Sequence, residues 1–264
     1  MELLQLLMIS ILPVCIVLYY VYKKDINKEP KQLLKKLFFR GMLICIPAAI
    51  IELILEPIFG KVDNMNLIKL FIYVFIDIAL VEELTKWFIL YKITYHNEEF
   101  DELYDAIVYA VFVSLGFACF ENIFYVLDAG FGVGLFRAVT AIPGHASDAI
   151  IMGNYFGLAK LSDINGKKEL KQKYLLLSII IPTITHAIYD YCLYTGQIIF
   201  VIIFIIFIIF IYIYSIKKIK NVALNNRNIV NNELVINHSV KYCNRCGSVT
   251  YGNYCSRCGN NLNN

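Results

Sequence analysis

Long apolar runs, separated by shorter polar stretches, dominate this chain from its start to about residue 216. A helix needs about 20 mostly apolar residues to cross a bilayer. Seven segments have that character: 3–22, 38–59, 67–93, 105–127, 134–160, 174–194 and 197–216. The pattern predicts an all-α polytopic membrane protein with about seven transmembrane helices.

Composition strengthens this interpretation. Of the 264 residues 59% are hydrophobic and only 17% are charged, and the mean hydropathy is +0.62. Soluble domains carry charge on about a quarter of their residues, so a soluble enzyme is excluded. The first apolar run begins with Glu2 and is followed by Lys23 and Lys24, which is not the layout of a secretory signal. We interpret it as a retained first span.

The lysines predict an orientation. They gather in the first connecting loop, in the fifth, and just after the last span, at positions 23, 24, 28, 31, 35 and 36, then 160, 167, 168, 171 and 173, then 217, 218 and 220. Positively charged loops stay in the cytoplasm, whereas acidic residues, such as those of the third loop, weigh little. Seven spans with the N-terminus outside and the C-terminus in the cytoplasm satisfy all three signals.

Beyond the last span the character of the chain changes. An asparagine-rich stretch with few large apolar residues suggests a flexible linker. We therefore expect three parts: a transmembrane domain at 1–216, a linker at 217–240 and a small module at 241–264.

Ionisable and amide side chains interrupt four of the apolar segments. They are Glu82, Glu83 and Lys86; Glu121 and Asn122; His145 and Asp148; and His186 and Asp190. An ionisable group in hydrocarbon costs about 2.5–3.5 kcal/mol on insertion scales, and such groups usually face the protein interior and serve function. Four clusters on four helices predict one shared polar centre inside the bilayer.

Helix spacing predicts partners within each cluster. Lys86 follows Glu82 by four residues and Glu83 by three, so it can lie over either carboxylate. Asp148 and Asp190 share a helix face with His145 and His186, respectively, and a carboxylate on the second ring nitrogen typically orients a metal-binding or basic histidine. Pro143–Gly144 and Pro182 should loosen two of the helices, which is tolerated beside a cavity.

Depth along the spans separates the clusters. At 1.5 Å per residue, Glu121, His186 and His145 lie roughly 9, 12 and 16 Å from the outer ends of their spans, and Glu82 and Glu83 roughly 23 Å. This favours Glu121, His145 and His186 as a metal-binding trio and leaves a glutamate of the pair as base or partner. Glu52, Glu56, Asp77 and Arg137 are weaker candidates.

The polar residues form an ordered set of motifs: E-E-x-x-K at 82–86, F-x-x-x-E at 117–121, His145, and H-x-x-x-D at 186–190. In that order, and over roughly residues 40–195, the chain resembles the PrsW family of intramembrane proteases. That family is distantly similar to the CAAX-processing and bacteriocin-processing membrane proteases. Those relatives have a histidine in their second motif, where this chain has Glu121. The resemblance implies a bacterial integral-membrane peptidase that makes the first cut in a membrane-bound anti-sigma factor.

The family is classed as metallopeptidase, although its relatives have also been argued to use a glutamate base without metal. The resemblance thus implies that the nine polar residues are catalytic, with a catalytic Zn²⁺ or without one. It also implies a single-span membrane protein as partner, within the lipid bilayer of the bacterial cell membrane. Two other classes stay open: a transporter or metal/proton carrier using the same buried groups, and an inactive scaffold.

The C-terminal module carries two near-identical C-x-R-C-G turns. Cys243, Cys246, Cys255 and Cys258 give the pattern C-x2-C-x8-C-x2-C. Four thiolates in paired turns suit tetrahedral Zn²⁺, and metal ligation would supply the folding free energy that so short a module lacks. Two disulfides would need an oxidising compartment. We expect a cytoplasmic zinc ribbon for docking or regulation, since two arginines are too few to indicate nucleic-acid binding.

Overall fold

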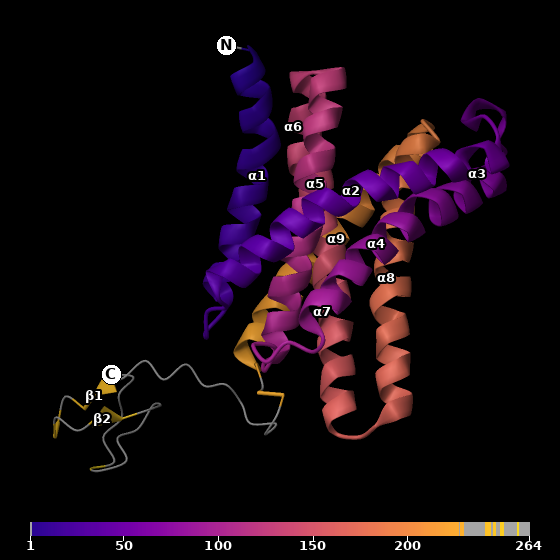
Figure 1. Ribbon diagram of the computed structural model, residues 1–264. Coiled ribbons are helices and arrows are strands. Elements are labelled where there is room, and N and C mark those ends of the chain that lie inside the picture. The colour runs from indigo at the N-terminus through magenta and orange to yellow at the C-terminus, as the bar shows by residue number, and fades with distance from the viewer. Residues whose placement is uncertain are drawn as a thin grey trace.

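The structure is a computed structural model that describes residues 2–226, 228–229, 241–243, 245–246, 249–250 and 258. It confirms the all-α membrane architecture (Figure 1). Within the described residues, five helices are long and apolar enough to cross a membrane. They are α1 (Glu2–Lys24), α2 (Lys31–Phe59), α5 (Leu103–Ala129), α8 (Lys168–Tyr194) and α9 (Ile198–Leu224).

The two other predicted spans, 67–93 and 134–160, are helical but too polar to meet this criterion, so five helices rather than the expected seven meet it in the described part of the chain. After the short 3₁₀-helix η1 (Val62–Asn64), the 67–93 segment divides into α3 (Leu67–Tyr73), the π-helix η2 (Val74–Ala79) and α4 (Leu80–Thr94). The 134–160 segment divides into α6 (Phe131–Val139) and α7 (Ala141–Ile164). Both segments supply residues of the polar centre.

The sequence predicts that Pro143 and Pro182 loosen helices α7 and α8, and the structure differs between the two. The break between α6 and α7 falls at Thr140, so Pro143 lies in the first turn of α7, where its missing N–H leaves no helical hydrogen bond unmade. Pro182 remains inside α8. The loosening predicted around Pro143 is thus a break between two helices at Thr140, three residues before the proline.

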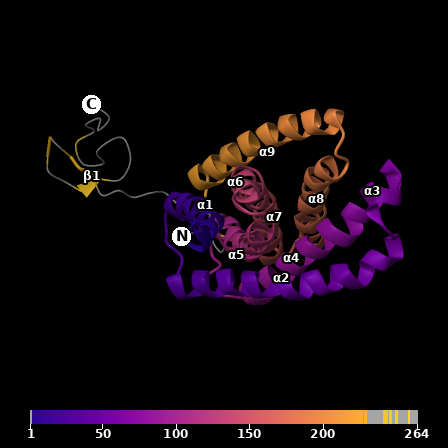
Figure 2. The same ribbon diagram turned by 90° about the horizontal axis from the view of Figure 1, so that it is seen from above.

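Helix α5 lies at the centre of the bundle. Of its most apolar stretch 83% is buried by protein, against 17% for α1 and for α9. Viewed from above, α1, α2, α4, α8 and α9 surround α5 and α7 (Figure 2). A helix that is apolar all round can face lipid on one side and protein on the other, which explains why α1, α2 and α9 keep large apolar side chains exposed.

Two glycines let α2 and α5 cross with their backbones in contact. A Cβ atom on Gly41 would lie 2.0 Å from the carbonyl oxygen of Val113, and one on Gly116 would lie 2.1 Å from that of Phe38. Small residues at such crossings are how membrane helices gain close packing without a hydrophobic driving force. The contact at Gly116 fixes α2 against α5 directly before Phe117 and five residues before Glu121.

The lysine-rich loops and the end of α9 lie on one side of the bundle (Figure 1). Asn27 of the α1–α2 loop donates to Glu102, which precedes α5, and Asn226, just after α9, donates to Glu102 over 2.6 Å. Near the α7–α8 turn, Lys160 Nζ donates to the carbonyl oxygen of Tyr95 over 2.6 Å. The loops predicted to share a compartment therefore contact one another.

The start of the C-terminal tail differs from the expected linker. Residues 217–224 continue α9, and Asn226 Oδ1 accepts a hydrogen bond from the backbone N–H of Tyr104. Half of the predicted linker, residues 227 and 230–240, lies outside the described residues. The tail then forms the antiparallel strands β1 (Lys241–Tyr242) and β2 (Val249–Thr250).

We expect Gly116→Ala to destabilise the protein by about 1–3 kcal/mol, because the added methyl group meets backbone that cannot rotate away. Gly132→Ala in α6 is the matched control, since no atom lies within 4 Å of its Cβ position. Thermal unfolding of both variants in one detergent measures the difference. Equal unfolding temperatures would contradict the close crossing.

Candidate functional site

Four helices deliver the predicted polar residues to one place. Helix α4 supplies Glu82, Glu83 and Lys86, α5 supplies Glu121 and Asn122, α7 supplies His145 and Asp148, and α8 supplies His186 and Asp190. Glu82, Glu83, His145 and His186 are all buried, and each offers a ligand atom within 4.8 Å of the others. The shared polar centre expected from the sequence is therefore present.

Lys86 is the central cation of this site and is only 1% exposed. Its Nζ lies 2.9 Å from Glu82 Oε2, 2.9 Å from Glu83 Oε1 and 3.3 Å from His145 Nδ1. It also lies 4.2 Å from the ring centroid of Phe117. An ammonium group has three donors, and this geometry gives each of them an acceptor. The local i,i+3 and i,i+4 pairing predicted from the sequence is thus observed on both glutamates.

His186 lies between two carboxylates. Its Nδ1 is 2.9 Å from Glu83 Oε1, and its Nε2 is 3.2 Å from Asp190 Oδ2. The His145 ring stands nearly perpendicular to it, at 88° with centroids 5.3 Å apart. Each ring nitrogen of His186 therefore has a carboxylate oxygen within hydrogen-bond distance.

His145 is held from the opposite side by α5. Its Nε2 lies 3.0 Å from Glu121 Oε2, and Arg137 Nη2 lies 3.0 Å from the same oxygen. Arg137 Nε donates to Asn122 Oδ1 over 2.9 Å, and its guanidinium lies 3.9 Å from the ring centroid of Tyr125. Glu121 therefore orients His145 and is itself fixed by an arginine of α6.

Two geometric expectations from the sequence are wrong. Asp148 shares a helix with His145 but accepts a hydrogen bond from Thr185, and no hydrogen bond joins Asp148 to His145 among the described residues. The depth separation of Glu82 and Glu83 from the histidines is also absent. Helices α2, α3 and α4 run obliquely to α5, so counting residues overestimates the depth that they cover (Figure 1).

The predicted metal-binding trio of Glu121, His145 and His186 is therefore not the group of side chains that lies close together in the structure. Within the described residues, the group of potential ligands in the bilayer consists of the two glutamates of α4 and the two histidines, without Glu121. Glutamate and histidine are ligands that catalytic zinc sites use. Glu83 Oε2 is buried and has no hydrogen-bond partner in the described structure, so the donor set fits a metal ion. Lys86 shares both glutamates with any such ion.

A cavity of about 610 Å³ opens beside this cluster. Helix α2 and η2 form one wall, and α5, α7 and α8 form the other. Glu82, His145 and His186 line it, whereas Glu83 does not appear among its lining residues. Glu82 is therefore the glutamate that a molecule in the cavity would meet, and Glu83 lies behind it.

Four further charged residues of the cavity wall gave only weak signals in the sequence. They are Glu52, Glu56, Asp77 and Arg137, and none of them has an oppositely charged partner at helical spacing. The π-helix η2 carries Asp77, whose buried carboxylate oxygens have no hydrogen-bond partner within the described residues. π-Helical turns often occur at functional sites, but no pattern in the sequence predicts this π-helix.

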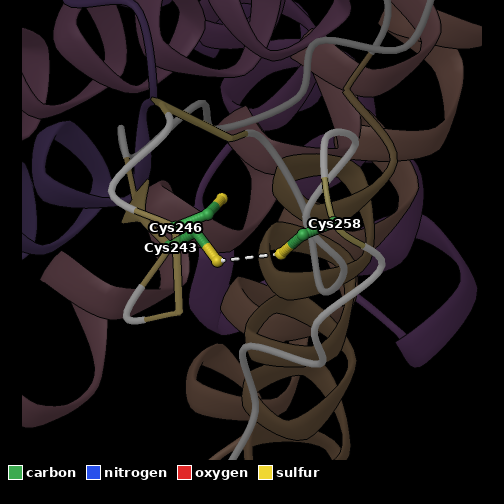
Figure 3. Close-up of side chains that lie close together, drawn as sticks. All are labelled: Cys243, Cys246 and Cys258. Atoms are coloured by element: carbon green, nitrogen blue, oxygen red, sulfur yellow. Dashed lines mark hydrogen bonds between the residues drawn. The ribbon is translucent and has the colours of Figure 1, made fainter.

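The C-terminal module brings three of its predicted ligands together (Figure 3). The Sγ atoms of Cys243, Cys246 and Cys258 lie within 4.8 Å of one another, and those of Cys243 and Cys258 are 3.5 Å apart. Thiolates around tetrahedral zinc lie about 3.8 Å apart, given a Zn–S bond of about 2.3 Å. The fourth predicted ligand, Cys255, lies outside the described residues.

Comparison with known proteins agrees with the geometry. The model of the PrsW family of intramembrane metalloproteases matches residues 29–214. Protease PrsW of Oceanobacillus iheyensis is 38% identical over 190 residues, which cover 72% of this chain and 83% of that protein. Protease PrsW of Bacillus subtilis is 36% identical over 185 residues, covering 70% and 80%, respectively. No solved structure matches the chain.

We expect Lys86→Met to destabilise the protein by about 3–5 kcal/mol, because it leaves two buried carboxylates without their counter-ion. Lys92→Met is the matched control, since Lys92 lies on the same helix but is exposed. Thermal unfolding and the yield of folded protein measure the effect. A Lys86→Met variant as stable as Lys92→Met would show that the ion pairs contribute little.

Proposed function

Because the chain belongs to the PrsW family of intramembrane metalloproteases and is therefore an intramembrane peptidase, we propose that it hydrolyses peptide bonds in the cavity beside Glu82, His145 and His186. Family membership favours this function over the transporter and the inactive scaffold. The observation that carries the proposal is the cluster of two glutamates and two histidines inside the helical bundle, of which Glu82, His145 and His186 line a cavity.

Glu82 is the proposed general base. Hydrolysis needs a group that takes a proton from water within hydrogen-bond reach of the scissile carbonyl. Glu82 lines the cavity, whereas Glu83 is fully buried and binds Lys86 and His186. Glu83 therefore positions its neighbours, and Glu82 is placed to bind and deprotonate a water molecule.

The histidines are the proposed electrophilic groups. His186 lies between Glu83 and Asp190, and its Nε2–H, which faces Asp190 in this structure, would be shared with the oxyanion that forms when water attacks the carbonyl. His145, oriented by Glu121, faces the same cavity. The network fixes both rings before substrate binds, so little reorganisation is required during the reaction.

A catalytic metal would be held by Glu82, Glu83, His145 and His186, and it would polarise the scissile carbonyl and activate water. The remaining members of the predicted site have supporting positions. Asn122 holds Arg137 against Glu121, and Asp148 is fixed by Thr185 of the neighbouring helix. Zinc is the proposed metal because imidazole and carboxylate are among its usual ligands.

A single-span anti-sigma factor is the proposed substrate. The resemblance noted in the sequence implies this class, and the cavity wall supports a membrane-embedded peptide as its occupant. Helix α2 lines the cavity with apolar side chains such as Ile46, Ile50 and Leu53, while the opposite wall holds the polar centre. An extended apolar segment could lie against α2 with its backbone carbonyl groups toward the histidines.

The proposed orientation places the N-terminus outside and the tail in the cytoplasm. Its support is the lysine distribution together with the mutual contacts of the loops and of the residues after α9. In that reducing compartment the cysteine module would bind structural Zn²⁺ through Cys243, Cys246, Cys255 and Cys258.

We expect Glu82→Gln and His186→Ala each to abolish cleavage of a co-expressed anti-sigma factor, because the first removes the base and the second an oxyanion donor. Asp190→Asn should lower the rate less, about 10–100-fold, as changes behind a functional histidine typically do. Immunoblots of the intact and cut substrate measure the effect at matched enzyme levels.

Asp128→Asn is the control for this series, because Asp128 is an exposed acid at the end of α5, outside the cavity wall. It should cleave like the wild type. If both Glu82→Gln and His186→Ala cleave the substrate like the wild type, the proposal that hydrolysis occurs in this cavity is wrong.

A zinc assay should separate the two proposed metal sites. Cys243→Ser should lose about one zinc ion per chain and keep its protease activity, because the cysteine module is separate from the cavity. A chelator should still inhibit this variant, and added Zn²⁺ should restore it. Cys15→Ser, which changes an exposed cysteine of α1, should keep all its zinc. Full activity of chelated Cys243→Ser would point to a glutamate-base mechanism without metal.

A further inference from the structure

A second cluster of carboxylates lies far from the cavity, on the side of the bundle that holds the lysine-rich loops. Asp25 of the α1–α2 loop, Glu102 and Asp105 offer oxygen atoms within 4.8 Å of one another. Their exposed fractions are 4%, 3% and 0%, respectively. Three carboxyl groups this close and this buried need either protons or a cation.

Helix capping explains only part of this arrangement. Asp105 Oδ2 accepts the backbone N–H of Glu102 over 2.7 Å, and the side chain of Glu102 completes a capping box at the start of α5. Asn27 and Asn226 donate to the two oxygens of Glu102. These contacts use both oxygens of Glu102 and one oxygen of Asp105, and they leave Asp105 Oδ1 without a hydrogen-bond donor in the described structure.

Three oxygens are left without a partner. Both carboxylate oxygens of Asp25 and Oδ1 of Asp105 are buried and accept no hydrogen bond within the described structure. Lys28 is the neighbouring cation, but its Nζ donates to the backbone carbonyl oxygens of Tyr22 and Asp25 instead of to a carboxylate. Buried acceptors without donors are costly, so the cluster has the features of an incomplete coordination shell.

We propose that Asp25, Glu102 and Asp105 bind one hard divalent cation, Ca²⁺ or Mg²⁺. The donor set contains carboxylate oxygens and neither imidazole nor thiolate, which selects these ions over zinc. The site joins the α1–α2 loop to the start of α5. Through Asn226 it also touches the first residues of the tail that leads to the cysteine module. Bound cation would hold these three segments together.

Calorimetric titration of the chelator-stripped, full-length protein at pH 7.5 tests the proposal, with Ca²⁺ and Mg²⁺ in separate runs. Wild type should bind one ion that Asp25→Asn binds at least tenfold more weakly, and the cation should raise the unfolding temperature of wild type alone. Glu98→Gln is the control, since it removes an exposed acid from the same side of the bundle. All three proteins keep the cavity and the cysteine module, so the difference isolates this cluster.

The ion-free proteins provide the second measurement. In chelator, Asp25→Asn should unfold at the wild-type temperature or above, because it replaces a buried acid that lacks a partner. Asp105→Asn changes a second proposed ligand and should also lose the ion. The proposal fails if wild type binds neither ion at millimolar concentration, or if Asp25→Asn binds like wild type. It also fails if Asp25→Asn is destabilised in chelator, since Asp25 would then have a structural role only.

Discussion

The ammonium group of Lys86, buried between Glu82 and Glu83, is the interaction on which the polar centre depends. Removing a charge from water costs several kcal/mol, and only well-placed partners offset that cost. Lys86 finds them on its own helix and, through His145, on α7. Because Glu83 also binds His186 of α8, a single cation indirectly fixes the relative positions of three helices.

The irregular backbone of this protein gathers around the same centre. The π-helix η2 directly precedes α4, the α6–α7 break precedes His145 by five residues, and Pro182 precedes His186 by four. Non-helical backbone at membrane depth is tolerated where it lines a cavity or is buried in protein. The lipid-facing helices α1 and α9 are continuous, as the absence of hydrogen-bonding solvent in hydrocarbon requires.

The cysteine module, the polar centre and the acidic cluster offer three different sets of potential metal ligands. Thiolates stand in the tail, imidazole and carboxylate in the bilayer, and carboxylate alone at the α1–α2 loop. The acidic cluster, with carboxylate oxygens alone, suits harder ions than the two sites proposed for zinc. Asn226 connects the acidic cluster to the start of the tail through its hydrogen bond to Glu102.

The sequence by itself determined the apolar segments, the polar residues among them and the pairs within one helix, such as Lys86 with Glu83 and His186 with Asp190. Helical spacing is local, so it fixes which side chains share a face. The tertiary structure alone decided that Asp148 meets Thr185, that Arg137 holds Glu121, and that the glutamates of α4 reach the histidines. Those contacts depend on the tilt and rotation of packed helices, which arise from close crossings such as that of α2 with α5 and are not encoded in the spacing of residues along any one helix.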